Sequence, residues 1–123
     1  MSSIGDGIGI FLAGDVMTGR GIDQILVNPS RPELHESYVR DARAYVALAE
    51  ERNGPIPRAV DPAYVWGVAL DVLADVEPDA RIVNLETSIT QSDAWSGEKG
   101  IHYRMHPGNI DVLAVAGLDC CSL

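Results

Sequence analysis

Apolar runs, amphipathic stretches and turn signals alternate along this chain. Residues Ile8 to Ala13 are continuously apolar and stop at Gly14, which is typical of a buried parallel strand. Asp61 followed by Pro62 is a typical helix start, because an aspartate caps free backbone N–H groups and proline suits the first turn. The pattern predicts further strands at 81–86, 101–105 and 118–123, and helices at 18–27, 35–52, 62–76 and 110–116.

The order of these elements predicts an α/β fold with parallel strands, since long helical connections separate the strands. The last predicted strand reaches Leu123 with no turn or polar segment after it. Residues 1–123 are therefore expected to be the N-terminal portion of a single, incomplete domain. The exposed edge of this third strand is expected to favour self-association.

Composition narrows the class of protein. The 123 residues suit one domain, and 46% of them are hydrophobic, an ordinary globular balance. The formal net charge is −9, and Lys99 is the single lysine. A surface for nucleic acid or an anionic membrane needs clustered Lys and Arg, so neither partner is expected.

Two further features of the sequence bear on redox chemistry and localisation. Cys120 and Cys121 are adjacent, which suits neither an unstrained disulfide nor a metal-binding spacing, so both are predicted to be small buried apolar residues. The first apolar run has no basic residue before it and is far shorter than the ~20 residues of a membrane span. The chain is therefore expected to be soluble and cytoplasmic, with no membrane segment.

Candidate chemistry gathers where the first two strands end. Asp15 follows the first strand, and Asn84 and Glu86 close the second. Ligands of open parallel sheets bind outside the carboxyl ends of the strands, so these side chains are expected to share one crevice. Two carboxylates brought close repel each other unless a cation lies between them. Arg20 or a divalent metal ion could supply that charge.

Each of these residues also has a purely structural interpretation. Asp15 could cap the following helix, Asn84 could be a turn residue, Glu86 could be a surface acid, and Arg20 could form a surface ion pair. The three histidines, His35, His102 and His106, are each expected on other elements, and the last two are the better candidates for lining a site. A phosphate loop is not supported, because the Lys-Ser/Thr that should follow the Gly14-x-x-x-x-Gly19 spacing is absent.

Three motifs in order carry a family resemblance: "GDVMTGRG" from Gly14, "NLETSIT" from Asn84 and "AGLDCCSL" ending at Leu123. Together they resemble the CapA family of poly-γ-glutamate capsule biosynthesis proteins. In that family the first motif is Gly-Asp-hydrophobic-Met-x-x-Arg and the second is Asn-x-Glu. The third continues into Ala-Asn-Asn-His, which lies beyond this chain.

The resemblance implies a calcineurin-like metallophosphoesterase fold, a sandwich of two sheets flanked by helices, with a dinuclear metal centre at the strand ends. Asp15 would match the first metal ligand and Glu86 the acid of the second motif, a candidate bridging ligand. Asn84 would be a neighbouring polar ligand, and Arg20 would bind a phosphate or carboxylate. The expected general-acid histidine lies after Leu123, so no catalytic residue is assigned here.

The function implied is a part in synthesis or export of poly-γ-glutamate capsule, by a metal-dependent, phosphoesterase-like hydrolase that is inactive as this piece alone. Its partners would be divalent metal ions and a small-molecule or poly-γ-glutamate-related anionic substrate. Two alternatives remain open: a ligand- or metal-binding module without catalysis, and an α/β domain whose strand-end acids only cap helices.

Overall fold

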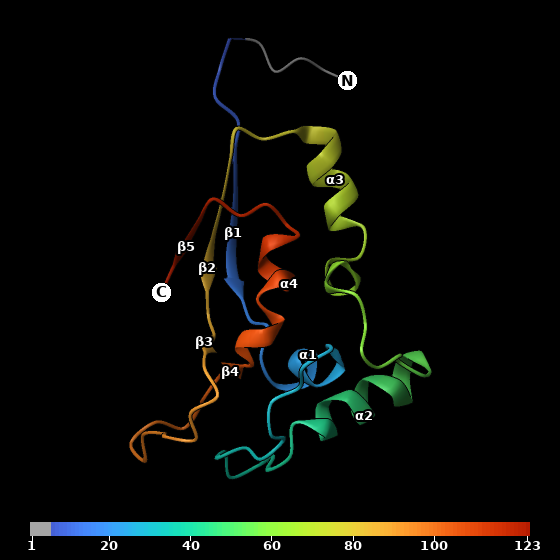
Figure 1. Ribbon diagram of the computed structural model, residues 1–123, viewed down its shortest axis with the longest axis vertical. Helices are drawn as coiled ribbons and strands as arrows, with labels where there is room; N and C mark the ends of the chain where they lie inside the picture. Colours follow the sequence, from blue (N-terminus) through green and yellow to red (C-terminus); the bar gives the residue numbers. More distant parts are fainter. Residues whose placement is uncertain (1–5) are drawn as a thin grey trace.

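The computed structural model describes residues 6–123 and confirms the predicted α/β class (Figure 1). A three-stranded sheet has the order β1-β2-β5, and both strand pairs are parallel. Strands β3 and β4 form a second, two-stranded parallel sheet. The strands are β1 (Ile10–Val16), β2 (Ala80–Leu85), β3 (Ser88–Ile89), β4 (Arg104–Met105) and β5 (Cys120–Ser122), and the α-helices are α1 (Arg20–Ile25), α2 (Arg43–Asn53), α3 (Ala69–Val76) and α4 (Asp111–Ala114).

Helices α3 and α4 lie on one side of the three-stranded sheet (Figure 1). On that side Val83 and Leu85 of β2 are buried, and Leu85 joins Val112 and Leu113 of α4 in one apolar cluster. The cluster extends past the carboxyl ends of the strands to α1 and α2 through Ile25 and Val46. Burial of these side chains supplies the main drive for folding.

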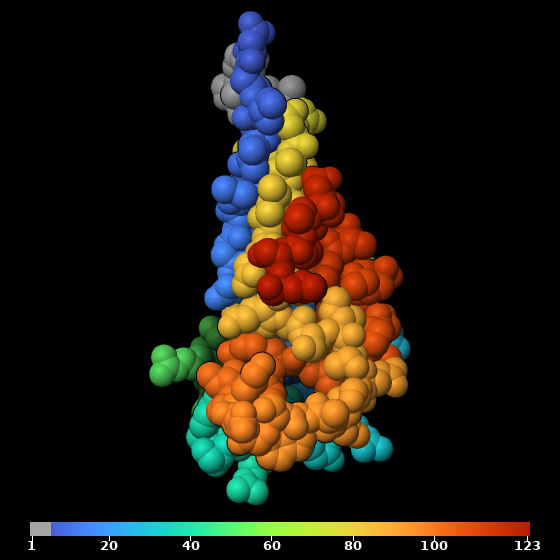
Figure 2. Space-filling view, turned by 90° about the vertical axis from the view of Figure 1, so that its left-hand side faces the viewer, coloured from blue at the N-terminus to red at the C-terminus, as the bar shows by residue number. Residues whose placement is uncertain are grey.

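The opposite side of the sheet is uncovered, and Figure 2 shows β1, β2 and β5 side by side on it. Ile8, Ile10 and Leu12 are 82%, 55% and 70% exposed. The prediction of a buried first strand is therefore wrong for this side, because helices cover only the other one. Cys120 is also exposed here, contrary to prediction, while Cys121 points to the core side and is half-buried; both cysteines are free.

Two predicted helices begin or continue differently in the structure. The helix expected at 35–52 starts only at Arg43, because the preceding segment folds back on itself: the Leu34 amide donates to the Arg40 carbonyl and the Ala42 amide to the Pro32 carbonyl. The helix expected at 62–76 is split into a 3₁₀ turn (Pro62–Trp66) and α3. Gly67, with a φ of 53°, separates the two parts.

The predicted cap of that second helix is confirmed. The Asp61 side chain accepts a hydrogen bond of 2.8 Å from the Ala63 amide, and Pro62 occupies the first turn.

The strand expected at 101–105 is reduced to β4, since 90–103 form a long loop between β3 and β4. Between residues 6 and 123, no helix combines the length and the apolar character that crossing a membrane requires.

Candidate functional site at the carboxyl ends of the strands

A β-bulge at the end of β1 determines where Asp15 points. Ala13 pairs with Val83, but the next paired residues are Asp15 and Asn84, so Gly14 is the extra residue. Side chains alternate along a strand, and one extra residue moves every later side chain to the other side. The bulge thus places Asp15 on the uncovered side of the sheet, together with Leu12, instead of in the core.

Three side chains from the three strands form a hydrogen-bonded row on this uncovered side. The Nδ2 amide of Asn84 donates to Oδ1 of Asp15 over 2.7 Å, and Ser122 Oγ donates to Asn84 Oδ1 over 2.7 Å. An ionised carboxylate only accepts, so Asn84 must turn its amide nitrogen toward Asp15. The amide oxygen then faces Ser122, whose hydroxyl must donate. We call Asp15, Asn84 and Ser122 the polar row.

Glu86 directly follows β2 and lies beyond the polar row. Its backbone amide donates to the Val16 carbonyl over 3.0 Å, which extends the pairing of β1 and β2 past the end of β2. Because alternate residues share a side, Glu86 faces the same side as Asn84, and it is exposed. The interpretation of Asp15 as a helix cap is wrong, since Gly19 occupies the N-cap of α1 and no side chain caps it.

Arg20 lies at the start of α1 and forms an ion pair with Glu36, with 2.6 Å between Nη2 and Oε1. The two side chains are 11% and 0% exposed. Burial alone would raise the pKa of Glu36, but hydrogen bonds from Arg20 and the His102 amide outweigh it and hold that pKa below its usual value. The guanidinium of Arg20 also lies over the Tyr103 ring. The structure thus places Arg20 against Glu36 and not between Asp15 and Glu86.

Asp23 is a structural residue that the sequence did not single out. It is 1% exposed, and its carboxylate accepts hydrogen bonds from the Ser30 amide (2.6 Å), the His106 amide (2.8 Å) and the Asn109 side chain (3.0 Å). These bonds tie α1 to segments far along the chain. Nothing in the local sequence signals this role, because its partners meet Asp23 only in the folded chain.

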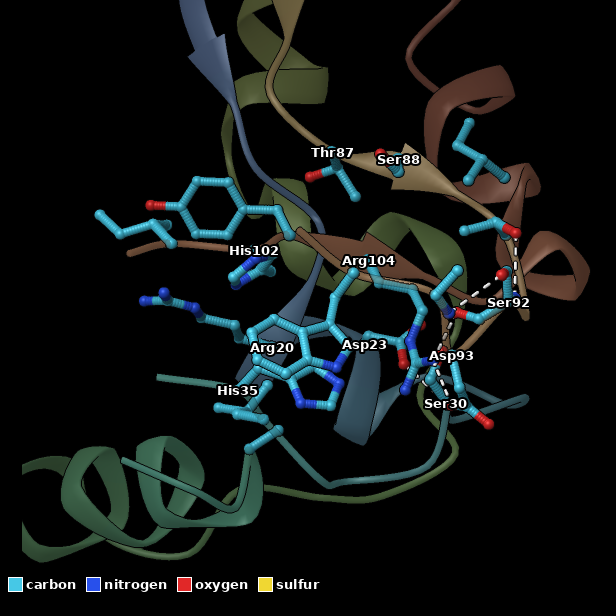
Figure 3. A pocket seen from close by; sticks show the side chains of 18 of the residues that line it. Arg20, Asp23, Ser30, His35, Thr87, Ser88, Ser92, Asp93, His102 and Arg104 are labelled. Atoms are coloured by element: carbon cyan, nitrogen blue, oxygen red, sulfur yellow. Dashed lines mark hydrogen bonds and ion pairs between the residues drawn. The ribbon is translucent and has the colours of Figure 1, made fainter. Parts of the chain in front are cut away.

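A hollow of about 890 Å³ lies beyond the carboxyl ends of the strands. Its lining includes Glu86 and Leu123 at the sheet end, together with parts of the 30–35 segment and the 90–104 segment. His35 and His102 lie with Arg20 on one side of it, and Arg104 with Asp93 on the other (Figure 3). His106 lines a smaller neighbouring hollow of about 280 Å³.

The carboxylates at the ends of β1 and β2 are oxygen donors of the kind that hard divalent ions prefer. Asp15 and Glu86 offer carboxylate oxygens, and Mg²⁺ or Mn²⁺ bind one or two carboxylates while keeping several waters. A zinc site needs more protein ligands, and no group of three His, Cys, Asp or Glu side chains able to hold a metal occurs within residues 6–123. Of the metal ions in question, Mg²⁺ and Mn²⁺ are the ones that take carboxylate oxygens such as those of Asp15 and Glu86 as ligands.

The parallel sheet with helices on one side and a polar site at the carboxyl ends of its strands makes this an α/β protein with a candidate ligand site. Comparison with known proteins shows which family it belongs to. The profile of a family described as bacterial capsule synthesis protein, PGA_cap, matches residues 9–123. The chain belongs to this family, whose members have a metallophosphoesterase-like fold. The expected CapA resemblance is confirmed.

Two relatives are probable polyglutamine synthesis accessory proteins of Mycobacterium tuberculosis, from strains CDC 1551 and H37Rv. Each is 47% identical to this chain over 118 residues, which cover 96% of this chain and 31% of the relative. The chain thus spans about a third of the length of these relatives. No solved structure matches it significantly.

Proposed function

We propose that this chain supplies part of the metal site of a hydrolase-like protein that acts in the synthesis of a capsule polymer of the polyglutamate type. The supporting observation is the bulge that turns Asp15 to the uncovered side of the sheet, where Asn84 holds it by a 2.7 Å hydrogen bond and Glu86 follows on the same side. Family membership supports the biological setting. What we propose beyond family membership is that Asp15 and Glu86 bind a metal ion and that the reaction is a hydrolysis.

In this proposal Asp15 and Glu86 hold a hydrated Mn²⁺ or Mg²⁺ ion. Such an ion, when bound, polarises an oxygen of the substrate and lowers the pKa of a bound water. Asn84 orients Asp15, and Ser122 orients Asn84. Because no third His, Cys, Asp or Glu joins a metal-binding group in the part of the chain that the structure describes, we expect this chain alone to bind metal without hydrolysing substrate.

Calorimetric titration with Mn²⁺ tests the metal site. Asp15→Asn and Glu86→Gln each remove one negative charge and one strong oxygen ligand, so each is expected to weaken Mn²⁺ binding by roughly tenfold or more. Asp75→Asn is the matched control, since Asp75 is an exposed acid on α3, away from the strand ends. Mn²⁺ affinity that neither strand-end substitution changes would contradict the proposal.

A second candidate function, a ligand-binding module without catalysis, is favoured by the 890 Å³ hollow, whose volume is that of a small-molecule site. The metal site requires the carboxylates of Asp15 and Glu86 at the strand ends, whereas a binding module without metal does not. Binding of an organic ligand that persists in a chelator, with no measurable affinity for Mn²⁺, would favour the binding module over the metal site.

A further inference from the structure

The loop between β3 and β4 forms part of the wall of the larger hollow, whose volume is about 890 Å³. Its middle part, residues 91–100, is exposed throughout and is coloured orange in Figure 2. Asp93 and Trp95 of this part line the hollow, and so do Arg31 and His35. Two segments that are far apart in the sequence thus meet at the hollow.

Both ends of the loop are anchored. The Ser88 amide donates to the Tyr103 carbonyl and the Thr90 amide donates to the Met105 carbonyl, each over 3.1 Å. These bonds accompany the pairing of β3 with β4 and hold the base of the loop together. Any movement of residues 91–100 therefore takes place on a fixed base.

Between these anchors, backbone hydrogen bonds do little to hold the loop in place. Within the part of the chain that the structure describes, one backbone–backbone hydrogen bond involves residues 91–100, and it runs from the Lys99 amide to the Ser96 carbonyl inside the segment. Side-chain contacts therefore hold these residues against the rest of the molecule. A segment with exposed residues and few backbone hydrogen bonds has low local stability.

An ion pair is the first contact that joins the two segments. Arg31 Nη1 lies 3.1 Å from Asp93 Oδ2, and the two side chains are 75% and 56% exposed. Such an exposed pair contributes little free energy and is screened by salt. Asp93 also pairs with Arg104 of β4 over 2.7 Å (Figure 3). Arg104 keeps the carboxylate paired when the contact with Arg31 breaks, so separating the two segments costs little.

A ring stack is the second contact. The His35 and Trp95 rings are stacked, with 4.4 Å between their centroids and an angle of 8° between their planes. His102, near the base of the loop, meets Trp95 edge-on at 5.4 Å, and its Nε2 lies 2.8 Å from the Ser96 carbonyl oxygen. Trp95 is 52% exposed, so the stack on His35 lies partly in water and is a modest contact.

We propose that residues 91–100 form a lid on the larger hollow, which the Arg31–Asp93 ion pair and the His35–Trp95 stack hold closed. Opening breaks both contacts together and widens the entrance to the hollow. Because one of the two contacts is an exposed ion pair, salt favours the open lid. The inference goes beyond the proposed metal site and does not depend on it.

NMR chemical shifts and relaxation dispersion test the lid, because the signals of a segment that opens as one unit change together. Arg31→Gln and His35→Ala are each expected to shift the signals of residues 91–100, including the Trp95 indole N–H, along one common line. Arg31→Gln should raise the population of the open form by up to about fivefold, as expected for loss of an exposed ion pair.

Two controls accompany this test. Arg40→Gln removes the same charge from an exposed position outside the lining and should leave the signals of residues 91–100 in place. The indole of Trp66 donates to the Val112 carbonyl outside the lining of the hollow, so its signal is the internal reference.

Salt provides an independent readout. Raising the ionic strength from about 0.01 M to about 1 M shortens the Debye length from about 30 Å to about 3 Å, so the parent signals should move along the same line as in Arg31→Gln. The Arg31→Gln variant should respond to salt much less. A Trp95 indole signal that Arg31→Gln does not move, or a salt response as large in that variant as in the parent, would overturn the inference.

Discussion

At the scale of single residues, Arg20, which the sequence predicts to bind a ligand, forms a buried ion pair with Glu36. Arg20 has a φ of 49°, an uncommon backbone conformation for a residue with a side chain, and its guanidinium reaches Glu36, Tyr45 and Tyr38. Glu36 is fully buried at its side chain. Removing one partner of a buried ion pair leaves the other without compensation.

Glu36→Ala is therefore expected to lower the free energy of unfolding by about 3–5 kcal/mol, as is typical for breaking a buried pair. Urea denaturation followed by circular dichroism measures this change. Asp41→Ala breaks the exposed pair with Arg43 and is the matched control, for which a much smaller change is expected. Equal destabilisation by the two substitutions would contradict the buried role of Glu36.

The same pair gives stability a defined dependence on pH. The pKa of Glu36 is lowered from its ordinary value of 4.5 in the folded state, so the unfolded chain binds the proton more readily. The stabilisation is fully present above about pH 4.5 and is lost as the pH falls through the folded-state pKa. Urea denaturation at a series of pH values should show this loss, and the loss should be smaller in Glu36→Ala. An unchanged acid dependence in that variant would count against the assignment.

Ser122 is expected to fix the amide of Asn84. Without its hydroxyl, Asn84 loses the partner of Oδ1 and can rotate away from Asp15, so Ser122→Ala should speed exchange of the Asn84 side-chain amide hydrogens, measured by NMR. Ser122→Thr restores a hydroxyl and should restore slow exchange. Ser88→Ala, another exposed serine of a strand, is the control. Exchange in Ser122→Ala as slow as in the parent would mean that Ser122 does not orient Asn84.

The sequence predicted some of the residues of the candidate site but not their contacts. Asp15, Asn84 and Glu86 could be placed at strand ends because the apolar runs stop just before or around them. The bulge that turns Asp15 to the uncovered side could not be predicted, since it appears only in the register with β2. The partners of Arg20 and Asp23 come from distant segments, and no periodic pattern encodes such contacts.

At the scale of elements, Gly19 sets how closely α1 approaches β4. A Cβ added at Gly19 would lie 2.7 Å from the Arg104 carbonyl oxygen, a backbone atom that can move only with its strand. Gly19→Ala is therefore expected to destabilise the protein by about 1–3 kcal/mol, as overpacking does. Gly14→Ala is the matched control, because a Cβ there meets nothing within 4 Å. Thermal unfolding compares the two, and equal midpoints would contradict the close approach.

The predicted elements were most accurate where local signals act alone. The Asp61 cap and strand β2 were predicted nearly as observed, because capping and a buried apolar run depend on adjacent residues. The predicted start of α2 was wrong because Glu36 pairs with Arg20, and this tertiary contact outweighs the helical pattern of residues 35–42. Tertiary context commonly overrides intrinsic helix propensity in this way.

At the scale of the whole molecule, the polar row lies on the uncovered side of the sheet, and the hollow lies beyond the carboxyl ends of its strands. One side of the sheet is therefore structural, because it packs on α4 and faces α3, and the other side carries the polar row (Figure 1). The apolar residues Ile10 and Leu12 are exposed on this same side, in a chain that spans 31% of the length of its relatives.

The most direct test of the central claim is an NMR titration of the chain with Mn²⁺, whose unpaired electrons broaden the signals of nearby nuclei. We predict that the amide signals of Asp15, Asn84 and Glu86 disappear first and that the effect fades along the strands toward Ile10 and Ala80. Broadening that begins elsewhere, for example at the acids of α3, or that spreads evenly over all exposed acids, would contradict a metal site at the carboxyl ends of β1 and β2.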